Sequence, residues 1–117
     1  MASRSVQVHF NNSTDSVLTL KKAALSHGEW SQDDSVPGSV AAGQQNVQWG
    51  SESDGFMTGT EGSATFTLGS GGEVTLNWDN PYYGSNSYSS SVPGGFKCTY
   101  TGGGEDNANV TFTLEPA

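Results

Sequence analysis

The chain has 117 residues, which is enough for one domain with a single hydrophobic core but not for two. It holds 12 acidic and only 4 basic residues, and the resulting net charge of −8 argues against binding to nucleic acids or anionic lipid surfaces. Only 32% of the residues are apolar, but the chain includes 5 Phe, 4 Tyr and 3 Trp, whereas a disordered chain is poor in aromatic residues.

Regular alternation of apolar and polar residues predicts β-strands along most of the chain. The first strand, Ser5–Phe10, is followed by polar residues 11–15 that predict a turn. The second, Ser16–Leu25, loses its phase at Ala23-Ala24, which indicates a bulge or a bend. A long connection is expected over Glu52–Gly62, and the glycine-rich residues 69–72 predict a hairpin. Further strands are predicted at Gln45–Gly50, Ala64–Leu68, Glu73–Trp78, Phe96–Tyr100 and Asn109–Leu114.

Seven or eight short strands at even spacing predict an all-β fold, a single antiparallel β-sandwich that comprises residues 1–117 as one domain. The core is expected to contain the residues that share the apolar phase: Val6, Val8, Phe66, Leu76, Phe96, Val110 and Phe112. The lone cysteine, Cys98, cannot form an internal disulfide. It alternates in phase with Phe96 and Tyr100, so we expect a buried and unreactive thiol.

The segment from Trp78 to Tyr88 is the strongest functional signal in the sequence, because it gathers three tyrosines and a tryptophan within eleven residues. Pro81 has no amide hydrogen and Gly84 is a breaker, so the strand is expected to end at Trp78 and to be followed by an aromatic loop. Aromatic rings with one polar tip suit a surface that is half apolar and half wet, such as a layer of lipid headgroups or the face of a sugar.

Catalytic chemistry has no support in the sequence. The two histidines, His9 and His27, show no metal-ligand spacing, and His9 is expected to face solvent. No general acid and base are brought to one site, so we expect neither an enzyme nor a cofactor. The oxygen-rich residues best suited to calcium are Glu105, Asp106, Asn107 and Asn109, but no EF-hand pattern is present and we expect no metal.

The motif Trp78-Asp79-x-Pro81-aromatic-x-Gly84-Ser85, preceded by Ser51–Asp54 and by Thr58–Phe66, resembles the aegerolysin family. Aegerolysins carry a related Trp-Asp-x-Pro-Trp-Gly-Ser stretch after a Gly-Thr-x-Gly strand. The order of elements is also similar to that of actinoporins, which have a Thr-Gly-x-x-Gly strand, a hairpin and a loop rich in Pro and Tyr. Both resemblances imply a β-sandwich that binds membrane lipids.

Residue by residue, Pro81, Tyr82 and Tyr88 match the proline and tyrosines that hold phosphocholine in actinoporins. A trimethylammonium group is well held over ring faces, at about 0.5–2 kcal/mol for each cation–π contact. The resemblance therefore implies a site for a zwitterionic or sphingolipid headgroup. The residues expected to form it are Trp30, Trp49, Asp79, Pro81, Tyr82, Tyr83 and Tyr88.

Two departures from actinoporins bear on pore formation: the first strand begins almost at once, without an amphipathic segment before it, and the chain is acidic. We therefore expect that the chain alone forms no pores and acts, as aegerolysins do, by recognising lipid and recruiting a larger pore-forming partner in a cytolytic or insecticidal system. Without an apolar leader or an 18-residue apolar run, we expect a soluble protein, cytoplasmic or released without a conventional signal, that acts at target membranes.

Two other functions remain open. A lectin-like module would stack sugars on the same rings and use Asp79, Asn80 and Asn86 as hydrogen-bonding partners. A structural or crystal-forming toxin component would need no pocket at all. Sugar-free vesicles separate these alternatives, because a lectin should ignore them.

Overall fold

The structure is a computed structural model that describes residues 2–117, and across this range the chain forms strands and turns without a helix. The strands are β1 (Ser5–Asn12), β2 (Leu18–His27), β3 (Glu29–Trp30), β4 (Ser39–Val40), β5 (Val47–Glu52), β6 (Thr60–Leu68), β7 (Glu73–Asn80), β8 (Ser87–Ser91), β9 (Phe96–Gly102) and β10 (Asn107–Pro116). Among the same residues, none belongs to a helix with the length and apolar character needed to span a bilayer.

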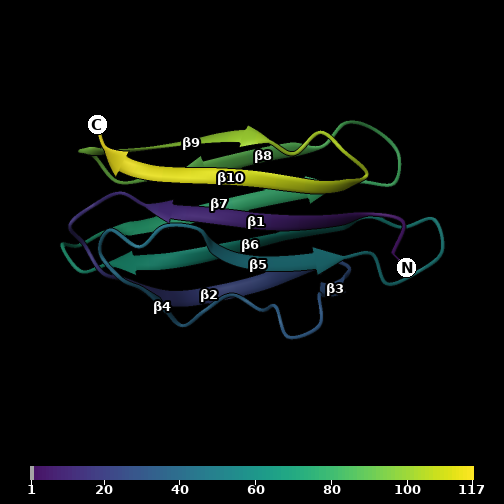
Figure 1. Cartoon of the computed structure of the whole chain (residues 1–117), viewed down its shortest axis with the longest axis horizontal. Coiled ribbons are helices and arrows are strands. Elements are labelled where there is room, and N and C mark those ends of the chain that lie inside the picture. Colours follow the sequence, from purple (N-terminus) through teal and green to yellow (C-terminus); the bar gives the residue numbers. More distant parts are fainter. Residues whose placement is uncertain (1) are drawn as a thin grey trace.

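Two five-stranded sheets pack face to face as a sandwich, which confirms the predicted fold class (Figure 1). Sheet A has the order β3-β5-β1-β10-β9, and sheet B has the order β4-β2-β6-β7-β8. The pairing is antiparallel as predicted except at one ladder, because β1 and β10 pair in parallel at the centre of sheet A. Alternation of side chains is the same in both pairing modes, so the sequence pattern carries no information about this ladder.

The core lies between the sheets and follows the predicted alternation. Six of the seven predicted core residues are buried, which confirms them. Phe96 is only half-buried, because β9 is the edge strand of sheet A and lacks a neighbour on one side. The centre of the core is aromatic: Trp49 lies between Phe66 and Trp78, with ring centroids 6.1 Å from each.

Several strand ends differ from the prediction. β1 continues to Asn12, whose buried amide donates hydrogen bonds to the carbonyls of Ser16 and Ala41 and so stabilises the turn that follows. The predicted irregularity in β2 is present, but the register shifts lie at Lys21 and Ser26 and not at Ala23-Ala24. The sequence interpretation missed β8, because its serine-rich sequence lacks the apolar alternation of an inner strand.

Cys98 lies on β9 and is half-buried, less than the sequence predicted. Burial raises the pKa of its thiol, and a hydrogen bond involving Ser90 opposes that effect only in part. Because the thiolate is the reactive form, we expect Cys98 to react with a thiol reagent at neutral pH several-fold more slowly than in the unfolded chain, by an order-of-magnitude argument. Labelling rates with and without denaturant measure this ratio, and equal rates would contradict it.

Candidate functional site

Two loops meet at one end of the sandwich, which we call the loop end (Figure 1). Residues 53–59 connect β5 to β6, and residues 81–86 connect β7 to β8. The loops touch at Gly59, where an added Cβ would lie 2.5 Å from the carbonyl oxygen of Asn80 and 2.7 Å from the Cα of Pro81. Only glycine allows this backbone-to-backbone approach, so the two loops form one unit.

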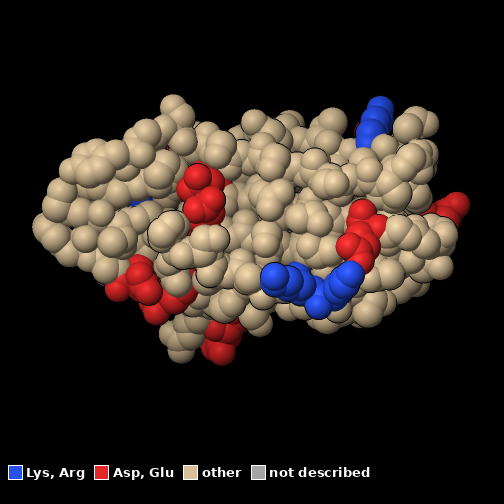
Figure 2. Space-filling view, turned by 180° about the vertical axis from the view of Figure 1, so that it is seen from behind, with Lys and Arg blue, Asp and Glu red and all other residues tan. Residues whose placement is uncertain are grey.

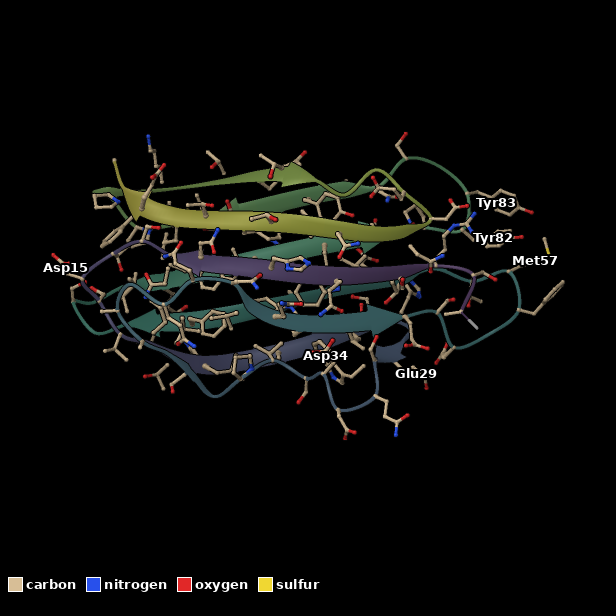
Figure 3. The ribbon with its side chains drawn as sticks, in the orientation of Figure 1. Asp15, Glu29, Asp34, Met57, Tyr82 and Tyr83 are labelled. Atoms are coloured by element: carbon tan, nitrogen blue, oxygen red, sulfur yellow. The ribbon has the colours of Figure 1, made fainter. Side chains whose placement is uncertain are left out.

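Three large apolar or aromatic side chains project from the loop end into solvent. Phe56 is 90% exposed, Tyr83 is 74% exposed and Met57 is 42% exposed. We call Phe56, Met57 and Tyr83 the apolar tip; Met57 and Tyr83 lie together at this end in Figure 3. Thr58 closes the turn beneath Phe56, because its hydroxyl donates to the carbonyl of Gly55 and accepts from the amide of Gly55. Met57 has a φ of 56°, an uncommon conformation for a residue other than glycine and one that tends to occur at functional loops.

Arg4 fixes the aromatic loop from the side of sheet A. Its guanidinium lies 4.5 Å from the centroid of the Tyr82 ring and donates a hydrogen bond of 2.9 Å to the Tyr82 carbonyl. The same guanidinium lies 3.7 Å from the carboxylate of Asp106. Tyr82 therefore already stacks with a cation of the protein, and its ring also makes a T-shaped contact with Tyr83, with 4.8 Å between the ring centroids.

Pro81 and Tyr82 also line a cavity of about 320 Å³, which we call the headgroup pocket. Its lining consists of His27, Thr58, Gly59, Thr60, Glu61, Asp79, Pro81 and Tyr82. Glu61 on β6 lies directly opposite Asp79 on β7, and both point away from the core. We call these two residues the acid pair.

The acid pair concentrates negative charge at this pocket. Burial raises the pKa of Asp79 above its ordinary value, the neighbouring Glu61 raises it further, and His27 partly opposes both effects. The imidazole Nε2 of His27 lies 3.8 Å from a carboxylate oxygen of Glu61. Like charges directly opposite one another on neighbouring strands are destabilising, so a ligand that brings a positive charge or hydrogen-bond donors would stabilise this arrangement.

The charge around the pocket is mainly negative. Figure 2 shows the molecule from behind: acidic side chains lie toward both ends of this face, while most of the visible Lys and Arg side chains lie away from the loop end. Lys21 pairs with Glu73 and Lys97 pairs with Glu115, both away from the pocket. The headgroup pocket is therefore suited to cations and unsuited to phosphate.

The structure separates the seven sequence-predicted site residues into two groups. Asp79, Pro81 and Tyr82 line the headgroup pocket, and Tyr83 belongs to the apolar tip. The remaining residues, Trp30, Trp49 and Tyr88, lie elsewhere.

The prediction that Trp49 belongs to the site is wrong, because Trp49 is completely buried in the core and presents no ring to a surface ligand. Trp30 is half-buried on β3, where its ring centroid lies 6.0 Å from that of Trp78, and it does not line the pocket.

Tyr88 belongs to β8 and not to the loop, because β7 continues to Asn80 and the loop is shorter than predicted. Its hydroxyl donates to the carbonyl of Gly103, and its ring packs against Phe112 and Tyr100. Burial raises the pKa of Tyr88 to about 12. Tyr88 is thus a structural residue, and we expect Tyr88→Ala to destabilise the fold and not to act on ligand binding alone.

The oxygen-rich residues considered for calcium form hydrogen bonds with separate groups of the protein. Asn107 accepts a hydrogen bond from Ser5, Asn109 pairs with His9, and the carbonyls of Glu105 and Asp106 accept from the amide of Asn80. Within residues 2–117, no three His, Cys, Asp or Glu side chains are grouped so that they could hold a metal ion.

Comparison with known proteins assigns the family. A model of the Aegerolysin family matches residues 3–109. The chain belongs to the aegerolysin family.

This aegerolysin resembles one curated protein and several solved structures. It is 28% identical over 107 residues to an uncharacterized protein of Dictyostelium discoideum; the match covers 89% of this chain but only 9% of that protein. The lipid binding protein Nakanori superposes with a TM-score of 0.89 at 16% identity, over 98% of this chain and 72% of Nakanori. RahU, in complex with a TRIS molecule, superposes with a TM-score of 0.78 at 20% identity, over 100% and 98% of the two chains. At these identities the structures establish the shared fold.

Sequence reasoning about this aegerolysin missed several residues of the loop end. Phe56 and Met57 lie in a polar connection between Gly55 and Gly59. Two adjacent large apolar residues in such a loop could have indicated an exposed apolar surface. Glu61 could have been found from the hairpin at residues 69–72, because the register of that hairpin places Glu61 opposite Asp79. No local pattern indicates the contact of Arg4 with Tyr82, since 78 positions separate them.

The contact between the two loops yields a test. Gly59→Ala is expected to push the loops apart, because the new Cβ would clash with the backbone of Asn80 and Pro81. We expect vesicle binding to fall several-fold, with a destabilisation of about 1–3 kcal/mol. Gly38→Ala is the control for lost glycine, because its backbone is outside the left-handed region and the Cβ at that position meets no atom within 4 Å. Thermal unfolding and vesicle co-sedimentation measure both effects, and a Gly59→Ala variant that binds like the wild type would contradict the coupling.

Proposed function

We propose that this aegerolysin binds membranes through its loop end, where the apolar tip enters the interfacial layer and the headgroup pocket holds the ammonium group of a zwitterionic phospholipid or sphingolipid. The observation that carries the proposal is the convergence of three exposed apolar side chains with an acidic, aromatic-lined cavity at one end of the sandwich. Exposed apolar side chains alone, or a polar cavity alone, would not point to a membrane. Together they match a lipid headgroup layer, which is apolar next to the acyl chains and polar next to water.

The chemistry of the pocket favours an ammonium group. Two carboxylates and the aromatic side chain of Tyr82 line the cavity, and cations are stabilised both by carboxylates and over aromatic rings. RahU, which shares the fold, binds TRIS, a primary ammonium compound that also carries hydroxyl groups, and Nakanori is a lipid binding protein. Both observations support a small cationic ligand or a lipid headgroup for this chain.

The net charge of −8 disfavours any contribution from attraction to anionic lipids. Affinity should therefore come from insertion of the apolar tip and from short-range contacts in the pocket. We further propose, from the family, that lipid recognition serves to recruit a larger pore-forming partner at a target membrane. On this proposal the chain alone binds zwitterionic vesicles without releasing an entrapped dye.

Co-sedimentation with vesicles tests the proposed function. Sphingomyelin vesicles and ethanolamine-headgroup vesicles are compared over a salt series, because screening weakens exposed charge interactions and leaves insertion nearly unchanged. We expect binding to at least one of these membranes, with an affinity that changes by less than about threefold as salt rises from about 0.05 to 0.5 M. Failure to bind any zwitterionic membrane would overturn the proposal.

A further inference from the structure

A second cavity adjoins the headgroup pocket on the outer face of sheet B. It measures about 350 Å³ and lies farther from the apolar tip along strands β6, β7 and β8, and we call it the distal hollow. Glu61 and Asp79 line both cavities, so the acid pair forms the boundary between them. The distal hollow is at the lower end of the range of ligand pockets, which suits a single monosaccharide unit.

The distal hollow is lined mainly by small polar side chains that follow from the sheet register. Trp78 and Tyr88 also line it, but their rings pack against Trp49 and Phe112 of the core. The row Ser63–Asn77–Ser89 crosses three neighbouring strands next to the row Glu61–Asp79–Ser87. All six side chains line the cavity. Serines leave open space where longer side chains would cover the sheet, and they supply hydroxyl groups that both donate and accept.

Several polar groups of the hollow remain available to a ligand. Within residues 2–117, the carboxylate of Asp79 accepts no hydrogen bond from the protein. The same carboxylate is partly buried, and burial raises its pKa. The amide of Asn77 donates one hydrogen bond of 3.2 Å to Ser89, which leaves its carbonyl oxygen and its second N–H unused. Carboxylate and amide oxygens accept from hydroxyl groups, and the amide N–H and the serine hydroxyls donate to them.

We infer that the distal hollow binds a neutral sugar unit, carried beyond the first group of a membrane-lipid headgroup. No lysine or arginine lines the cavity, so phosphate and sulfated sugars do not fit. Its lining is mainly hydroxyl, amide and carboxylate, so an apolar ligand does not fit either. The alternating donors and acceptors of a neutral hexose match the carboxylate oxygens of Asp79 together with the unused carbonyl oxygen and second N–H of the Asn77 amide. This subsite rests on the proposed lipid binding, because it extends the same binding site away from the membrane.

The structure revises the residues that a sugar would contact. The sequence favoured Asn80 and Asn86, but Asn80 is buried and donates to the carbonyls of Ser5 and Asp106. The amide of Asn86 donates to the carbonyls of Gly103 and Glu105. Both amides therefore serve the fold, and Asn77 takes the place expected for them.

The test compares sphingomyelin vesicles with the same vesicles that also contain lactosylceramide, whose second hexose lies beyond the first group of the headgroup, or glucosylceramide, which lacks that second hexose. We expect lactosylceramide to tighten binding of the wild-type chain by about threefold to tenfold relative to glucosylceramide, the gain of one or two added hydrogen bonds. Ser63→Phe, which fills the hollow, and Asn77→Val, which removes its amide, should abolish the gain and leave binding to sugar-free vesicles unchanged.

Thr67→Phe is the matched control, because Thr67 is exposed on the same strand but does not line the hollow. It should retain the whole gain. The inference is overturned if lactosylceramide binds no tighter than glucosylceramide, or if the gain survives both Ser63→Phe and Asn77→Val. Its failure is distinct from failure of the proposed function, which would appear as loss of binding to sugar-free vesicles.

Discussion

Replacing Phe56 and Met57 together with serine is expected to weaken binding to zwitterionic vesicles by at least a factor of about 100. Burial of one such side chain contributes roughly 1.5–3 kcal/mol, and each 1.4 kcal/mol corresponds to a factor of about ten in affinity. Phe56 is 90% exposed in the free protein, so its removal should leave the stability of the fold nearly unchanged.

Val17→Ser is the matched control for this pair. Val17 is also an exposed apolar residue, at 51%, but it lies beside the hairpin at residues 69–72 and away from the loop end, as the bond from the Gly69 amide to its carbonyl indicates. Co-sedimentation should give wild-type affinity for Val17→Ser. A Phe56→Ser/Met57→Ser variant that keeps wild-type affinity would remove the apolar tip from the binding surface.

Neutralising the acid pair should weaken vesicle binding but stabilise the fold. Glu61→Gln combined with Asp79→Asn is expected to reduce binding by about tenfold or more, since a hydrogen bond to a charged group contributes about 1.5–3 kcal/mol. The same variant should be more stable than the wild type, because it removes a cross-strand repulsion of about 0.2–1 kcal/mol, or about 1–4 °C in Tm. Loss of stability together with unchanged binding would contradict a functional role for the pair.

The stability gain should depend on pH in a defined direction. The pKa of Asp79 is higher in the folded protein than in the unfolded chain, so the folded state binds this proton more tightly. The resulting contribution to stability is present below the ordinary carboxyl pKa and is lost as the pH rises through the folded pKa. Asp79→Asn should therefore exceed the wild type in stability at neutral pH, and the difference should shrink as the pH falls. Thermal unfolding across acidic and neutral pH measures it.

Much of the sandwich could be predicted because its inner strands alternate clearly. Val6 and Val8 on β1 and Phe66 on β6 are buried as the pattern predicts. Strand pairing could not be predicted in the same way. The parallel ladder of β1 and β10 joins the two ends of the chain, and no local sequence pattern indicates such long-range contacts. The edge strand β8 was not predicted either, because its exposed serines show no alternation of apolar and polar residues.

The aromatic residues show where sequence interpretation of the site stops. Tyr82 and Trp49 are both aromatic residues beside polar segments, yet Tyr82 lines the pocket and Trp49 is buried in the core. Trp49 is in phase with Val47, and both side chains are buried, as alternation along a strand predicts. Phe56 was the reverse case, because its loop lacked any period that could assign a direction to its side chain.

The central claim is that the loop end, and not another surface, contacts the membrane. An environment-sensitive fluorophore attached at Phe56→Cys in a Cys98→Ser background reports this contact, and the same label at Asp15→Cys serves as the control at the opposite end (Figure 3). On addition of sphingomyelin or ethanolamine-headgroup vesicles, we expect a blue shift and an intensity increase at position 56 and no change at position 15. A response at position 15 without one at position 56 would contradict the claim.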